Sequence, residues 1–276
     1  MKKLFKKKLR PFYRFSKFIL KVNLLKTMYI NFKTQSFKNA IKLPIVVYGK
    51  LSIYSLRGSI IIDGPITTGM IQLGKDIDHN PISFCPIKLT VDGTLRFKGH
   101  AVISGGSTIT VWEGEVELGK FVSIGSGVQL KSVSAIWVGE YSRIVALCTI
   151  MDTNVHYVKN ILSGEISRSF SPIKIGNNCW INQGTVVAKG TVIPDYCITA
   201  RNSFLNKNYS NLCSSHSLLA GTPAKVIATN TQRIFDFEKE TQLNIFFRDN
   251  PEKNSFIDSE GIFVEPDSIP QIFKLI

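Results

Sequence analysis

Acidic residues are missing from the first 62 positions of this 276-residue chain, although that segment holds fifteen of its 34 lysines and arginines. The remaining residues carry nineteen basic and twenty acidic side chains, so the net charge of +14 belongs to the N-terminal segment. No apolar run is long enough to cross a bilayer, so we expect no membrane-spanning helix. Lysines interrupt the apolar N-terminal runs and no small-residue cleavage site follows, so we expect no secretory signal.

Cysteine and histidine are scarce. The five cysteines form no metal-binding or redox motif. Their odd number and the lack of an export signal favour a reducing compartment. The four histidines (His79, His100, His156 and His216) are widely spaced, and no two of them lie close together in the sequence. We therefore expect no metal site.

What the sequence has instead is a six-residue repeat between positions 91 and 200. The first position of each unit is usually aliphatic, and the fifth is mostly small. The first positions are Val91, Phe97, Ile103, Leu118, Ile124, Leu130, Val138, Ile144, Ile175, Ile181, Val187, Ile193 and Thr199. The fifth positions are Ala101, Ser107, Val122, Val128, Ser134, Ser142, Cys148, Cys179, Thr185, Thr191, Cys197 and Ser203.

A period of six fits neither an ordinary helix nor an alternating hairpin, and it is typical of a parallel β-helix. Each unit supplies one flat side of a triangular coil, so we expect three units to complete each coil. The first and fifth side chains should point into the prism. Cys148, Cys179 and Cys197 are then buried filler rather than reactive thiols.

The repeat resembles the hexapeptide-repeat acyltransferases, and three segments resemble the branch that acetylates sugars, polysaccharides and some antibiotics. They are residues 151–156 (Met-Asp-Thr-Asn-Val-His), residues 172–181 (Pro-Ile-Lys-Ile-Gly-Asn-Asn-Cys-Trp-Ile) and residues 219–227 (Leu-Ala-Gly-Thr-Pro-Ala-Lys-Val-Ile). The resemblance implies an all-β fold, a left-handed parallel β-helix. The residues outside the repeat add a helical N-terminal cap and a short helical C-terminal tail. Asn182 departs from the family, which usually has glycine there.

The resemblance also implies that His156 is the catalytic base of a direct acetyl transfer from acetyl-CoA to a hydroxyl. Histidine suits this task because it titrates near neutrality. Asp152, Asn154 or a backbone carbonyl could orient the ring, and the sequence leaves this choice open. No acyl-enzyme is required.

Family resemblance further implies a homotrimer that binds acetyl-CoA in a groove between neighbouring subunits. Six residues match positions that line this groove, from the thiol end to the nucleotide: Trp180, Gln183, Arg201, Asn206, Lys207 and Lys225. The implied acceptor is a sugar or polysaccharide.

We divide the chain into a basic helical cap (1–45), a β-helix domain (46–228) with an excursion loop (157–171), and a C-terminal helix and tail (229–276). Phe12, Phe15, Ile19, Val22, Leu25 and Tyr29 lie on one face of an expected N-terminal helix. That face either packs on the first coil or contacts an anionic membrane through residues 1–30. We expect a cytoplasmic protein that does not bind nucleic acid, with peripheral residence at the inner face of the cell membrane left open.

Three other functions remain as alternatives. Transfer to an amino sugar nitrogen needs the same groups. A zinc carbonic anhydrase of this fold needs histidines closer in sequence than these. A non-catalytic binding scaffold would not need the His156 segment.

Overall fold

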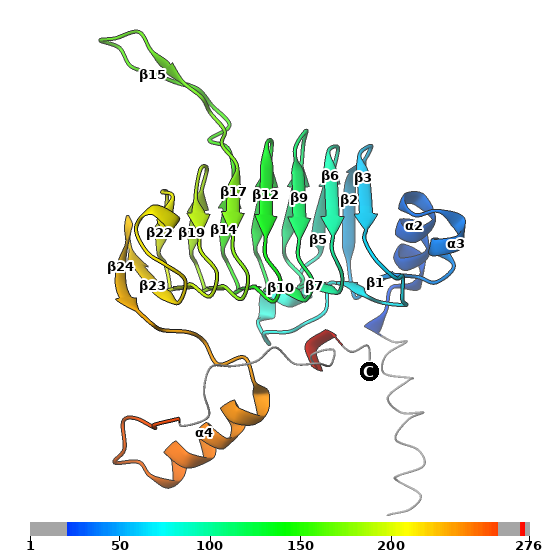
Figure 1. Ribbon diagram of the computed structural model, residues 1–276. Coiled ribbons are helices and arrows are strands. Elements are labelled where there is room, and N and C mark those ends of the chain that lie inside the picture. The colour runs from blue at the N-terminus through cyan, green and yellow to red at the C-terminus, as the bar shows by residue number, and fades with distance from the viewer. Residues whose placement is uncertain (1–20, 259–270, 274–276) are drawn as a thin grey trace, which may run out of the picture.

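The computed structural model describes residues 21–258 and 271–273. Consecutive strands enter three different sheets in turn, and strands three apart in chain order pair in parallel, as β4 with β7 and β5 with β8. The chain therefore winds as a coil whose flat sides form the sheets (Figure 1). The predicted left-handed parallel β-helix is confirmed.

The strands are short, and each sheet collects one side of every coil. In spatial order, the first sheet contains β1 (Ile45–Val47), β4 (Ile71–Leu73), β7 (Ala101–Ile103), β10 (Val122–Ile124), β13 (Arg143–Ile144), β18 (Trp180–Ile181), β21 (Ile198–Thr199), β23 (Ser217–Gly221) and β24 (Ala224–Thr229). The second sheet contains β2 (Leu51–Leu56), β5 (Ile87–Val91), β8 (Thr108–Val111), β11 (Gln129–Ser132), β14 (Thr149–Met151), β19 (Val186–Ala188) and β22 (Phe204–Leu205). The third sheet contains β20 (Val192–Ile193), β17 (Ile173–Ile175), β12 (Ala135–Val138), β9 (Glu115–Leu118), β6 (Thr94–Phe97) and β3 (Ser59–Ile62).

Burial follows the six-residue repeat. Every first-position residue named above is buried, and so is every fifth-position residue except the half-buried Ser134. The three cysteines at fifth positions are fully buried, as predicted, whereas Cys85 is exposed. Ser134 departs from the pattern because two extra residues separate Leu130 from Val138, so that Ser132 takes the inward place instead.

Coil length is not constant along the prism. Trp180 pairs with Ile198, three repeat units later in the chain, as the repeat predicts. Ala101, however, pairs with Val122, which lies beyond the position that three units would give. The prediction of three equal units in each coil is thus wrong for the earlier coils, whose extra residues are accommodated between strands and, where β2 pairs with β5, by a register shift between Ile53 and Ser55.

Helices α2 (Leu24–Thr34) and α3 (Phe37–Ala40) cover the open end of the first coil (Figure 1). Asn31 donates from Nδ2 to the carbonyl oxygen of Ile45 (2.6 Å) and accepts from its amide (3.1 Å). Thr27 accepts from the amide of Val47 (3.0 Å). These side chains satisfy the edge strand β1, which would otherwise expose unpaired backbone groups.

The helix expected through Val22 to Tyr29 is interrupted. Val22 forms a β-bridge with Tyr48, and Asn23 caps α2 by accepting a hydrogen bond from the amide of Lys26 (3.1 Å). The strong capping preference of asparagine explains why the helix restarts there. The expected helical residues Phe12, Phe15 and Ile19 lie outside the described residues.

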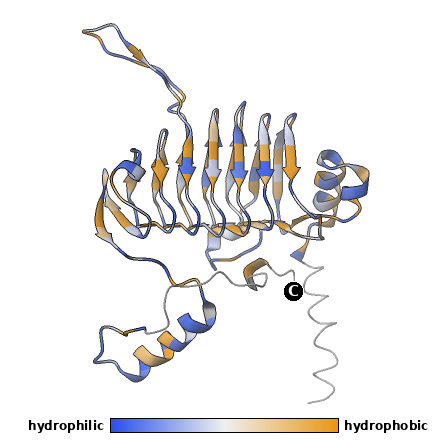
Figure 2. Ribbon diagram, in the orientation of Figure 1, coloured by the Kyte–Doolittle hydropathy of each residue, from blue (hydrophilic) through white to orange (hydrophobic). Residues whose placement is uncertain are grey.

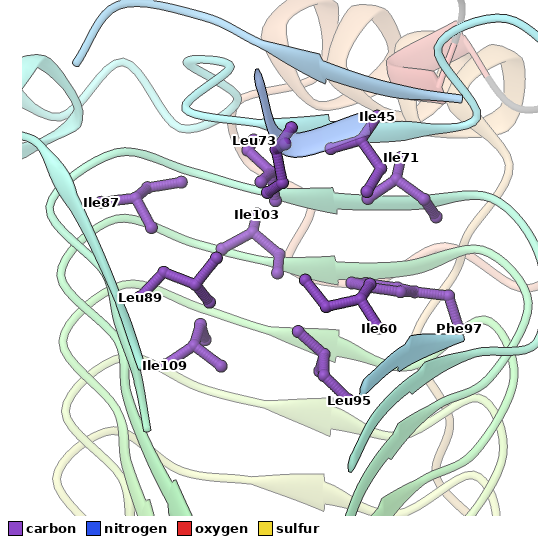
Figure 3. A pocket seen from close by; sticks show the side chains of 11 residues that line it. Ile45, Ile60, Ile71, Leu73, Ile87, Leu89, Leu95, Phe97, Ile103 and Ile109 are labelled. Carbon is purple, nitrogen blue, oxygen red and sulfur yellow. The ribbon is translucent and has the colours of Figure 1, made fainter. Parts of the chain in front are cut away.

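A small apolar cavity lies inside the prism just below the cap (Figure 3). Side chains from the first coils and from α2 line it: Ile30, Ile45, Ile60, Ile71, Leu73, Ile87, Leu89, Leu95, Phe97, Ile103 and Ile109. No polar atom faces this space, so it belongs to the hydrophobic core and not to a ligand site.

Beyond the last coil, β23 and β24 form an antiparallel hairpin that closes the first sheet. Helix α4 (Phe237–Asp249) begins after Asp236, which caps it by accepting from the amides of Glu238 and Lys239. The short 3₁₀ helix η3 (Gln271–Phe273) contacts the first sheet, with Gln72 donating to the carbonyl oxygen of Phe273 (2.7 Å).

Two further 3₁₀ turns are η1 (Pro81–Phe84) and η2 (Tyr209–Asn211).

Candidate active site

An arm formed by residues 153–171 leaves the prism between β14 and β17 and carries the hairpin β15 (Val158–Lys159) and β16 (Ile166–Ser167) (Figure 1). Its two ends are tied together, since the amide of Asn154 donates to the carbonyl oxygen of Ser169 (2.8 Å). His156 is exposed at the root of this arm. The predicted base therefore lies where a projecting hairpin meets a corner of the prism, a position suited to a substrate-facing group.

Asp152 anchors that root and is fully buried. Its carboxylate accepts hydrogen bonds from the hydroxyl of Ser132 (2.8 Å) and from the amides of Val133 and Ser134 (both 2.9 Å). Asp152 is one of the three groups left open as the partner of the His156 ring, and both of its oxygens accept hydrogen bonds from the neighbouring corner. The corner needs such an acceptor because the extra residues there leave two backbone amides without strand partners.

The segment from Asn154 to His156 is tightly turned. The His156 amide donates to the carbonyl oxygen of Asn154 (2.7 Å), and Val155 between them has a φ of +65°. The side chain of Asn154 is exposed. Other non-glycine residues at turns of the described chain share the left-handed conformation of Val155, among them Phe121 and Leu147, so the positive φ marks a tight turn.

Four of the six predicted cofactor residues lie on two edges of the second sheet. Gln183 and Arg201 precede β19 and β22, and the Arg201 guanidinium donates to Oε1 of Gln183 (2.8 Å). Asn206 and Lys207 follow β22, so they lie on the opposite edge, where the chain leaves β14 toward His156. Within one chain, His156 and the Gln183–Arg201 pair thus occupy different corners of the prism.

Lys189 is a residue that sequence reasoning missed. It follows β19 on the same edge as His156, and its ammonium donates to the carbonyl oxygen of Arg168 near the end of the arm. In the repeat it is an ordinary outward-facing lysine. Only its position one coil beyond Asp152 could have pointed to contact with the arm.

Trp180 lies apart from these groups, on the outer face of the first sheet. The C-terminal tail crosses this face, and the guanidinium of Arg233 lies 4.8 Å from the Trp180 ring centroid. Phe235 is contacted by both Arg233 (5.2 Å) and Arg143 (5.3 Å). Burial, together with the nearby Arg233, lowers the pKa of Arg143 to about 10. Lys225 is exposed on β24, the last strand of the same sheet.

The described residues contain no group of three or more histidine, cysteine, aspartate or glutamate side chains placed to hold a metal ion. His79, another strongly exposed imidazole, pairs with Asp76 (3.5 Å). Within the same described ranges, no helix has the length and apolar character needed to cross a bilayer.

Comparison with known proteins points in the same direction as the repeat. No family model matches the chain. Over 165 residues, 59% of its length, it is 26% identical to a probable acetyltransferase of Mycobacterium tuberculosis (strain ATCC 25618 / H37Rv). The chain spans about half the length of that relative (51%). It has the fold of the hexapeptide-repeat acyltransferases.

Solved hexapeptide-repeat structures are similar at low sequence identity. The polySia-specific acetyltransferase NeuO is 15% identical, with 78% of this chain and 91% of NeuO covered and a TM-score of 0.49. The polysialic acid O-acetyltransferase OatWY is 17% identical, with 71% and 99% covered and a TM-score of 0.41. AntD, an N-acyltransferase from Bacillus cereus, is 11% identical, with 75% and 89% covered and a TM-score of 0.41.

Proposed function

We propose that this protein transfers an acetyl group from acetyl-CoA to a hydroxyl of a sugar or polysaccharide, with His156 as the general base. One observation carries the proposal: an exposed histidine in a tight turn at the root of an arm that the buried Asp152 anchors. The similarity to a probable acetyltransferase supports this choice of reaction.

In the proposed mechanism, His156 accepts the proton of the acceptor hydroxyl as its oxygen attacks the thioester carbonyl carbon. The carbon–sulfur bond then breaks and the imidazolium returns the proton to the leaving thiolate. A backbone amide of a neighbouring coil is the expected donor to the oxyanion. This route needs no acyl-enzyme, so no nucleophilic serine or cysteine takes part.

For acetyl-CoA we propose a groove lined by Gln183, Arg201, Asn206, Lys207 and Lys225, whose basic side chains suit phosphate groups. The first two lie on the opposite edge of the second sheet from His156. A groove that reaches His156 of one chain and Gln183 and Arg201 of a neighbour would bring both edges together. We therefore propose a homotrimer in which two chains complete each site. Of the six predicted cofactor residues, Trp180 has the least support, because Arg233 lies over its ring.

The direct test is replacement of His156 by alanine in the full-length protein. We expect acetyl transfer to oligosaccharide acceptors to fall by about two to four orders of magnitude, because that is the range general-base catalysis supplies. His79→Ala is the matched control, since this imidazole is also exposed and lies on another loop. Turnover of His156→Ala near that of the unaltered protein would remove this residue from the role of base.

The same assay separates the acceptor classes. Acetylation of neutral sugars with release of free CoA supports transfer to oxygen. Acetylation confined to amino sugars, with the amide as product, would replace our proposal by the N-acetyltransferase alternative. A protein that binds oligosaccharides without consuming acetyl-CoA would instead be a scaffold.

A further inference from the structure

The two cap helices turn an apolar surface to the outside. On α2, the buried face consists of Thr27, Ile30 and Asn31, which satisfy the first coil. The apolar side chains lie elsewhere on the helices and are exposed: Leu24, Leu25, Met28, Tyr29, Phe32, Phe37 and Ile41. Leu25 and Phe37 are 82% and 75% exposed. A contiguous run of large apolar groups of this kind marks an interaction surface.

Basic residues surround this surface, which we call the cap surface, and no acidic residue comes before Asp63. Exposed lysines lie on the helices and just beyond them: Lys21, Lys33, Lys38, Lys42 and Lys50. Figure 2 shows hydrophobic and hydrophilic segments together on these helices. Since the cap closes one end of the prism, its outer side can approach a flat surface without obstruction from the coils (Figure 1).

We propose that the cap surface docks the protein on an anionic lipid bilayer. The exposed apolar side chains, with Leu25 and Phe37 foremost, would enter the interfacial region, while the lysines contact acidic headgroups. The axis of the prism would then point away from the membrane surface. The proposal does not depend on the acetyltransferase activity, although a lipid-linked acceptor would place substrate near this site.

The charge of the cap surface favours a lipid bilayer over a second copy of this chain as its partner. In a two-fold dimer the same patch meets itself, so the lysines of one copy would face those of the other with no carboxylate between them. An anionic membrane supplies the opposite charge.

The experiment is co-sedimentation of the full-length protein with vesicles of phosphatidylcholine alone or with phosphatidylserine added. Point variants are used because truncation would remove Ile30 and Asn31, which hold the first coil. We expect binding to the anionic vesicles that weakens as salt rises, and negligible binding to the neutral ones. Leu25→Ser/Phe37→Ser and Lys33→Gln/Lys38→Gln/Lys42→Gln should each weaken binding about tenfold or more.

Ile161→Ser/Leu162→Ser is the matched control. These side chains at the tip of the arm are 90% and 94% exposed, so the loss of apolar surface is similar but lies far along the chain from the cap. The control should bind vesicles like the unaltered protein. Equal binding by the Leu25/Phe37 variant, or equal binding to neutral vesicles, would overturn the proposal. So would lipid-free sedimentation showing that the Leu25/Phe37 variant loses self-association while vesicle binding is unchanged.

Discussion

Asp152 is a fully buried carboxylate that ties one corner of the prism to the start of the arm. Its three hydrogen bonds bind the corner formed by residues 132–134 to the start of the arm. Because hydrogen bonds to a charged group are stronger than neutral ones, this contact holds the segment that presents His156. We therefore propose that Asp152 affects His156 only by fixing the position of this segment.

Replacing Asp152 by asparagine should therefore lower stability more than it alters the reaction. The amide nitrogen of asparagine cannot accept from Ser134 or Val133, so we expect a loss of about 2–3 kcal/mol in the free energy of unfolding. Urea denaturation measures this, with the exposed Asn154→Ala as the control, whose change should stay within about 0.5 kcal/mol. An unchanged urea midpoint in the asparagine variant would contradict the anchoring role.

The buried thiols predict a stability that falls at alkaline pH. Burial raises the pKa of Cys148 and of Cys197 to about 12, and burial likewise raises that of Cys179, from an ordinary value near 9. A raised folded-state pKa stabilises below pH 9, and this contribution is lost as pH rises, because only the unfolded chain releases the proton. At pH 10 each thiol should lower the free energy of unfolding by about 1.4 kcal/mol relative to pH 7.

Unfolding of the unaltered protein and of Cys148→Ala at pH 7 and pH 10 checks this expectation. The variant should be less stable at pH 7, since it loses buried volume. Its decline between the two pH values should nevertheless be smaller by about 1.4 kcal/mol. Cys85→Ser, at an exposed position, serves as the control. An equal fall in the free energy of unfolding between pH 7 and pH 10 in all three proteins would refute the raised pKa of the Cys148 thiol.

At the scale of elements, two described parts of the C-terminal region contact the first sheet. Arg233 stacks over Trp180 at one end, and Lys75 donates to the carbonyl oxygen of Ile272 (2.8 Å) at the other. Cation–π contacts that are partly buried contribute about 1 kcal/mol each. Arg233 thus lies over Trp180, one of the residues that the family resemblance assigns to the cofactor groove.

Replacing Arg233 by alanine should uncover Trp180. In a Trp112→Phe/Trp137→Phe background, which leaves Trp180 as the single tryptophan, emission should shift to the red and stability should fall by about 1 kcal/mol. Arg248→Ala, whose side chain is mostly exposed, is the control. If Trp180 also contacts acetyl-CoA, addition of acetyl-CoA will quench its emission more in the Arg233 variant. Unchanged emission would show that Arg233 does not shield the Trp180 ring from solvent.

For the whole molecule, the two edges of the second sheet predict sites shared between subunits. We expect light scattering to give three times the chain mass. Variants His156→Ala and Arg201→Ala should each be inactive alone, yet mixed trimers should regain part of the activity, since some interfaces then combine an intact His156 with an intact Arg201. Inactive mixed trimers would argue that each chain carries its own complete site. An active monomer would reject the shared groove altogether.

Much of the fold was predictable because the repeat is local and the buried positions follow from it. An aliphatic or small residue every few positions, as at Ile181, Thr185 and Val187, can be buried in only one coil geometry. The corners were less predictable. The amide of Ser134 donates to Asp152, 18 positions later, at the corner formed by the two extra residues between Leu130 and Val138. The six-residue pattern does not predict that contact.

By itself the sequence determined the β-helix, the inward positions, the histidine at the start of the arm and the uneven charge, since each depends on residues close together in the chain. Tertiary structure alone decided that Gln183 and Arg201 lie on a different edge from His156, and that Arg233 covers Trp180. Those outcomes depend on which surfaces meet after the coil has wound. The apolar face of the cap stayed outside because the open edge of β1 requires hydrogen-bonding side chains, and the aliphatic ones cannot supply them.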